Sequence, residues 1–159
     1  MSKIKIHNLL YAPGQVLLHI QVHESKLIYL PPILATFREE GIAIPFIMHS
    51  FFPPKLITIT LTLDQKDMAM GQVAFQEGLD ISPPEFLKIK RKAVLIIIYG
   101  PHLGEIPGVV CRLHKLLSQE GVEILAMSAS LNSCLLVIQD LFLSKAKRAF
   151  AQIFEIPPG

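Results

Sequence analysis

The sequence has 159 residues, of which 51% are hydrophobic and 18% charged, with a formal net charge of +2 at pH 7. This near-neutral charge argues against a nucleic-acid partner. The basic residues also cluster only at 88–92, so they form no broad basic face. No apolar run approaches the roughly 18 residues of a membrane-spanning helix, and the N-terminus carries no apolar leader, so we expect a cytoplasmic protein without a membrane partner.

The first half of the chain predicts a strand, a helix, two strands and a second helix. The strands are expected at 15–22, 42–51 and 56–63, and the helices at 31–40 and 66–77. In the third strand isoleucines and leucines alternate with threonines, which indicates one face in a core. A further short strand is available at 86–89, just after Ser82-Pro-Pro84.

The second half repeats this order. Strands are expected at 94–99, 122–130 and 134–139, one helix between Pro107 and Gly121, and a second helix capped by Ser144. The continuously apolar 94–99 segment predicts a strand buried on both faces. Gly41 and Gly121 lie 80 positions apart, and each follows a predicted helix and precedes a short apolar stretch. The two halves of the chain are therefore copies of one repeat.

A strand count assigns the N-terminal residues. A ferredoxin-like β-α-β-β-α-β unit needs a fourth strand after its second helix, and the second copy ends almost at once at Ile156-Pro-Pro-Gly159. The alternating stretch Ile4-Lys-Ile6 is available to complete it. We therefore predict an α+β fold with two antiparallel-sheet domains, the first at 13–90 and the second formed by 1–12 plus 91–159.

Several stretches of the second half resemble the second ACT domain of the regulatory region of aspartate kinases. These are 94–100, Ile106-Pro-Gly-Val109, Leu116-Leu117, Gly121-Val-Glu-Ile124, Met127-Ser128 and 145–149, and the first half is similar at lower fidelity. The resemblance implies two ACT domains packed side by side, a small amino-acid effector, a homodimer or higher homo-oligomer and no cofactor. The kinase domain of that family is absent, so the resemblance implies a protein that is not an enzyme.

The main candidate site is the Gly/Pro loop that leads into the second-half helix. Such a loop presents unpaired backbone N–H groups at the positive end of the helix dipole, and both favour a carboxylate. The resemblance implies that the second strand of a neighbouring domain also reads the ligand. In this chain that strand supplies Ala126, Met127, Ser128 and Ala129 in the second copy and Ile47, Met48, His49 and Ser50 in the first. The predicted ligand-binding residues are Gly100, His102, Leu103, Gly104, Glu105, Ile106, Pro107, Gly108, Val109, Met127 and Ser128.

The first half departs from this pattern because it has no Pro-Gly pair before its helix. A second candidate site is predicted there at His23, Glu24, Ser25, Met48 and His49. His19 and His23 share a strand face with Glu24 nearby, but a third ligand is not evident and no metal site is predicted. Cys111 and His114 lie three apart on the predicted helix, where apolar neighbours favour a buried cysteine over a nucleophile.

Three functions remain open at the level of sequence. The leading hypothesis is a non-catalytic regulatory module that binds a small amino acid, either alone or as the regulatory subunit of a separate biosynthetic enzyme. The second is a structural oligomerisation module without a ligand. The third, a small enzyme, is disfavoured because the sequence contains no paired carboxylates, no Ser/His/Asp series and no phosphate loop.

Overall fold

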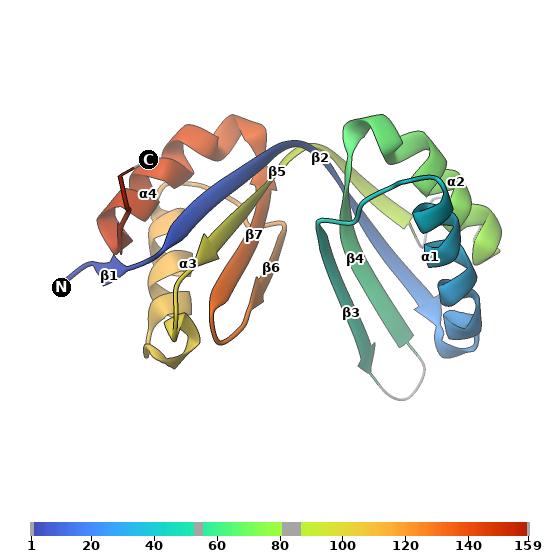
Figure 1. Cartoon of the computed structure of the whole chain (residues 1–159), viewed down its shortest axis with the longest axis horizontal. Helices are drawn as coiled ribbons and strands as arrows, with labels where there is room; N and C mark the ends of the chain where they lie inside the picture. Colours follow the sequence, from blue (N-terminus) through green and yellow to red (C-terminus); the bar gives the residue numbers. More distant parts are fainter. Residues whose placement is uncertain (1, 53–55, 81–86, 159) are drawn as a thin grey trace. The chain divides into compact units, whose positions relative to one another are not determined.

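The computed structural model describes residues 2–52, 56–80 and 87–158, and the chain divides into two compact units. Unit 1 comprises Met1–Pro13 and Ala93–Gly159, and unit 2 comprises Gly14–Lys92. In each unit two helices cover one face of an antiparallel sheet, so the architecture is mixed α/β (Figure 1). Strands β2 (Asn8–His23) and β5 (Leu87–Tyr99) are long enough to contribute residues to both units.

Unit 2 is built on the strand order β3-β4-β2-β5, with β3 at Phe46–Phe52 and β4 at Leu56–Asp64. Strand β4 pairs antiparallel with both neighbours. The helices are α1 (Leu30–Glu39) and α2 (Met68–Gly78), preceded by the 3-10 helices η1 (Glu24–Tyr29) and η2 (Gln65–Asp67). Phe37 of α1 and Phe75 of α2 meet edge to face in the core, with ring centroids 5.4 Å apart.

Unit 1 has the strand order β2-β5-β7-β6, with β6 at Ala126–Ala129 and β7 at Ser133–Gln139. Its helices are α3 (Val109–Gln119) and α4 (Leu143–Ile153), preceded by η3 (Leu103–Glu105) and η4 (Asp140–Phe142). The N-terminal β1 (Ile4–Lys5) pairs in parallel with the C-terminal β8 (Phe154–Glu155). Ile4 and Ile6 are buried in the same core as the helices.

Two predicted strands begin later than expected, because the residues after Gly41 and Gly121 still belong to helix ends. Both glycines have a positive φ, +67° and +71°. The N–H of Ile42 donates to the carbonyl of Phe37 at 2.8 Å, and the N–H of Val122 to that of Leu117 at 2.9 Å. These are Schellman caps, which hold the chain against the helix for several more residues. The strands therefore start at Phe46 and Ala126, not at 42 and 122.

Three further expectations were wrong. The predicted strands 86–89 and 94–99 belong to one continuous β5 that begins at Leu87, and Phe86 lies outside the described residues. The four basic residues between the two predicted strands, Lys88 and 90–92, are exposed and do not interrupt the strand. Ser144 does not cap α4, since the helix already begins at Leu143 and Phe142 stands at the N-cap without a side-chain hydrogen bond. Cys111 is exposed, because α3 buries Val109, Leu113 and Leu117 and turns Cys111 away from that face. No helix in the described part of the chain combines the length and apolar character needed to cross a bilayer.

Candidate functional site

A cavity of about 330 Å³ lies in unit 1 where α3 begins. One wall is the loop between β5 and α3 together with the first turn of α3, and the other wall is the end of the β6–β7 hairpin. The lining residues are Leu103, Gly104, Ile106, Pro107, Gly108, Val109, Val110, Cys111, Ala129, Ser130, Ser133 and Cys134. Its volume lies at the lower end of the roughly 300–1,000 Å³ typical of small-molecule sites.

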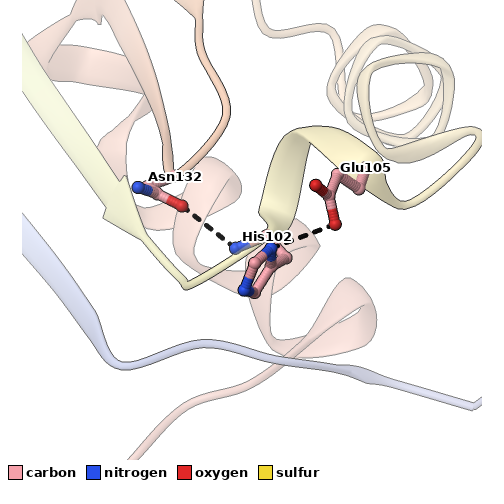
Figure 2. A network of polar contacts seen from close by, with 3 residues as sticks. All are labelled: His102, Glu105 and Asn132. Atoms are coloured by element: carbon pink, nitrogen blue, oxygen red, sulfur yellow. Dashed lines mark hydrogen bonds and ion pairs between the residues drawn. The ribbon is translucent and has the colours of Figure 1, made fainter.

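Backbone hydrogen bonds fix the loop against the hairpin. The N–H of Gly104 donates to the carbonyl of Leu131 at 2.7 Å, and the N–H of Gly100 donates to the carbonyl of Asn132 at 2.9 Å. The Asn132 side chain also accepts from the N–H of His102 at 3.1 Å, as Figure 2 shows. These three hydrogen bonds therefore hold the two walls of the cavity in a fixed position relative to each other.

The same close-up shows a contact between an imidazole and a carboxylate of the loop (Figure 2). Nδ1 of His102 lies 3.0 Å from Oε2 of Glu105 (Figure 2). Both side chains are well exposed, at 68% and 59%, and neither lines the cavity. This contact pairs the only acidic side chain of the loop with its only histidine, outside the cavity.

The first turn of α3 supplies hydrogen-bond donors to the cavity. Gly108 is the N-cap with φ +85°, and the first α-helical bond runs from the N–H of Arg112 to the carbonyl of Gly108 at 2.9 Å. Within the described residues, no acceptor is bonded to the N–H groups of Val109, Val110 or Cys111. Free N–H groups at the positive end of a helix dipole favour a carboxylate or another anion.

The hairpin wall supplies two hydroxyl groups. Oγ of Ser130 lies 2.9 Å from Oγ of Ser133, and both residues line the cavity. A hydroxyl both donates and accepts hydrogen bonds, so this pair can receive an ammonium group as well as bind an oxygen. The arrangement can therefore hold both ends of a small zwitterion.

Two thiols also line the cavity and differ in environment. Cys111 is exposed, whereas Cys134 is buried, and burial raises the pKa of the Cys134 thiol to about 11. Because the thiolate is the reactive form, Cys134 is chemically inert near neutral pH. Cys111 is the accessible thiol of the site.

The structure gathers part of the predicted site. Leu103, Gly104, Ile106, Pro107, Gly108 and Val109 all line the cavity. Gly100, His102 and Glu105 belong to the same loop but do not line it. Met127 packs against the core of unit 1, and Ser128 on the same strand is also outside the lining.

Five of the twelve lining residues were not predicted from the sequence, namely Val110, Cys111, Ser130, Ser133 and Cys134. Val110 and Cys111 directly follow the predicted loop, so the free N–H groups of a first helical turn were a usable signal for them. Ala129, Ser130, Ser133 and Cys134 come from the hairpin. These residues reach the cavity because Gly100, His102 and Gly104 donate hydrogen bonds to 131–132 of the hairpin. The spacing of apolar residues in the sequence does not predict such hydrogen bonds.

The residues of the second candidate site are not brought into one cavity. Nδ1 of His23 accepts a hydrogen bond from the N–H of Ser25 at 3.1 Å and so caps η1, which begins at Glu24. Met48 and His49 lie on β3, which β4 separates from β2. A cavity of about 370 Å³ in unit 2 lies instead between α1 and α2 and is lined by Tyr29, Pro32, Ile33, Thr36, Ala74, Glu77 and Gly78.

His19 has a structural partner in place of a metal. Its Nδ1 lies 2.8 Å from Oγ1 of Thr60 on the paired strand. Burial, and secondarily the positive charge of Lys88, lower the pKa of His19 below its ordinary value. Across the described residues no group of three or more His, Cys, Asp or Glu side chains is placed to hold a metal ion.

No family model and no curated protein matches the sequence. The similar proteins are solved structures that share its fold. The regulatory subunit of aspartate kinase from Thermus flavus superposes with a TM-score of 0.78 at 16% identity, over 94% of this chain and 99% of that one. The chain has the fold of aspartate kinase regulatory regions. This confirms the resemblance drawn from the sequence, and it is consistent with a ferredoxin-like ACT-type fold.

Two complete enzymes show the same match within a longer chain. The allosteric aspartate kinase of Clostridium acetobutylicum matches with a TM-score of 0.77 at 14% identity, over 98% of this chain and 36% of that enzyme. Escherichia coli aspartokinase III, solved with lysine and aspartate bound, matches with a TM-score of 0.63 at 16% identity, over 94% of this chain and 33% of the enzyme. The chain thus spans about a third of each of these enzymes.

Proposed function

We propose that this chain is a non-catalytic regulatory module that binds a small amino acid in the cavity at the start of α3. The observation that carries the proposal is the combination of free N–H groups on Val109, Val110 and Cys111 with the Ser130–Ser133 hydroxyl pair across one small cavity. The N–H groups suit an α-carboxylate and the hydroxyls suit an α-ammonium group. The likeness of fold to aspartate kinase regulatory subunits supports a regulatory role.

The proposal extends to the organisation of the molecule. We infer two ACT-type domains, of which the first in sequence corresponds to unit 2 and the second to unit 1. The pairing of β1 with β8 supports the assignment of the N-terminal segment to the second domain, unit 1. The module would act in the cytoplasm as a homodimer or higher homo-oligomer, or as the regulatory subunit of a separate biosynthetic enzyme. Regulation then requires that the effector bind one arrangement of the assembly more tightly than another.

Isothermal titration calorimetry of the full chain against the twenty amino acids tests the binding. A saturable signal from at least one of them is expected. Gly108→Ala should then weaken binding by at least about tenfold, because a positive φ is strained for alanine and the first turn of α3 would shift. Gly41→Ala is the matched control, since Gly41 has the same backbone strain and open space around it but lies in unit 2.

A structural oligomerisation module is the second candidate. It is favoured by unit 2, where the predicted ligand-reading residues are divided between the end of β2, η1 and β3, and where no Pro-Gly loop precedes α1. Silent titrations with all twenty amino acids, together with an oligomeric state that Gly108→Ala leaves unchanged, would support this function and contradict the sensor.

A further inference from the structure

We propose that the effector of this cavity is an amino acid with an uncharged, mainly apolar side chain. The inference rests on the proposed function and adds the chemical class of the ligand. Among the described residues that line the cavity, none carries a formal charge. The side chains that enclose it are aliphatic, thiol or small, apart from the hydroxyls of Ser130 and Ser133.

Two charged residues adjoin the lining in sequence, Glu105 and Arg112, and neither of them lines the cavity. Glu105 is the only acidic residue of the β5–α3 loop, and its carboxylate lies 3.0 Å from the imidazole of His102 (Figure 2). Both side chains extend into solvent, and neither lines the cavity. A cationic side chain of a ligand therefore has no carboxylate to meet inside the cavity, and an anionic one has no lysine or arginine.

The hydrogen-bonding groups of the cavity suit the α-carboxylate and the α-ammonium group, which all amino acids share. The free N–H groups of the first turn of α3 suit a carboxylate, and the two hydroxyls suit an ammonium group. A charged side chain would need further polar partners, and burying a charge without them is strongly unfavourable. An apolar side chain has the opposite effect, because each buried methylene strengthens binding by about fourfold.

The size of the cavity agrees with this class. At about 330 Å³ it lies near the lower limit for small-molecule sites, so it suits a ligand of a few heavy atoms better than a nucleotide or a peptide. Leu103 and Val109 are also members of the unit 1 core, so the inner wall of the cavity is continuous with that core. We therefore expect the side chain of the effector to point toward these two residues.

The test uses calorimetry of the full chain with pairs of ligands that differ in one group. Norleucine has the side-chain carbons of lysine without the ammonium group, and valine has the shape of threonine without the hydroxyl. Norleucine, leucine, methionine or valine is expected to bind, with lysine at least about tenfold weaker than norleucine and threonine weaker than valine. Gly108→Ala should remove the norleucine signal, which places it in this cavity.

The outcomes separate the two proposals. If lysine, arginine, aspartate or glutamate binds more tightly than every apolar amino acid, the inference about the side chain is overturned while the regulatory function stands. Threonine binding more tightly than valine, with norleucine silent, would overturn it equally. If none of the twenty amino acids and no norleucine binds, the proposed function itself fails.

Discussion

The Cα of Gly104 lies so close to the β6–β7 hairpin that a Cβ placed on it would stand 2.5 Å from the carbonyl oxygen of Ser130. The neighbouring atoms are all backbone, so no side-chain rotation can make room. The N–H of Gly104 also donates to the carbonyl of Leu131 at 2.7 Å, so a hydrogen bond holds the same two segments together. The cavity depends on this glycine because the contact sets the distance between its two walls.

Gly104→Ala is therefore expected to separate the loop from the hairpin. We expect a loss of about 1–3 kcal/mol in the free energy of unfolding, as for other overpacked positions, together with loss of amino-acid binding. Gly100→Ala is the control, because a Cβ there would lie 3.5 Å from Ile6 and make an ordinary contact. Denaturant unfolding and calorimetry of both variants measure the difference, and equal behaviour of the two would refute the close approach.

The N-terminal segment is expected to stabilise unit 1. Ile6 is buried there at 5% exposure, whereas Lys5 next to it is exposed. Ile6→Ala should cost about 2–4 kcal/mol by the loss of buried side chain and the cavity it leaves, and Lys5→Ala should cost little. Hydrogen exchange locates the effect, with faster exchange expected in α3 and β7 than in α1 and β4. Faster exchange in unit 2 alone would contradict the assignment of the segment to unit 1.

The two thiols are expected to react at very different rates. At neutral pH iodoacetamide should alkylate Cys111, which is exposed, and should spare Cys134, whose pKa burial raises to about 11. Mass spectrometry of the native protein should show one modification, and of the unfolded protein two. A bound effector should slow the reaction of Cys111, since that residue lines the cavity. Cys111→Ser is the control and should show no modification in the native state.

The stability of the protein is expected to fall as the pH drops below about 6.5. Burial and Lys88 lower the pKa of His19 in the folded state, so the unfolded chain binds a proton before the folded one does. The free energy of unfolding therefore decreases between the unfolded and the folded pKa, and protonation of His19 opposes folding. His19→Gln should flatten this part of the profile, and His49→Gln, at an exposed position on β3, is the matched substitution for comparison. An unchanged slope in His19→Gln would exclude His19 as the cause.

Periodicity predicted the helices and most strands, because each has a clear apolar face. Ile57, Ile59 and Leu61 of β4 and Leu113 and Leu117 of α3 are all buried as their spacing requires. Two of the errors, the early starts predicted for β3 and β6, lie where local hydrogen bonds override the hydrophobic pattern. Ile42 and Val122 look like strand residues, but each is buried as the second residue after a helix cap.

The candidate site was predictable on one wall only. Gly108 and the residues before it stand next to a helix start, which a sequence displays directly. Ser130 and Ser133 enter the cavity because the hairpin accepts hydrogen bonds from a loop about 30 residues earlier in the chain, as the His102–Asn132 bond shows. Such a long-range pairing depends on the packed fold, and neither spacing nor composition indicates it.

Unit 2 is a single stretch of chain, whereas unit 1 is assembled from both ends of the sequence. During synthesis at roughly 5–20 residues per second, unit 2 can fold as soon as residue 92 has left the ribosome. Ile4 and Ile6 must meanwhile wait, with their apolar side chains uncovered, until α4 and β8 have been made. The unit that carries the cavity therefore completes its core only after β8 has been made, whereas the core of unit 2 needs no residue beyond 92.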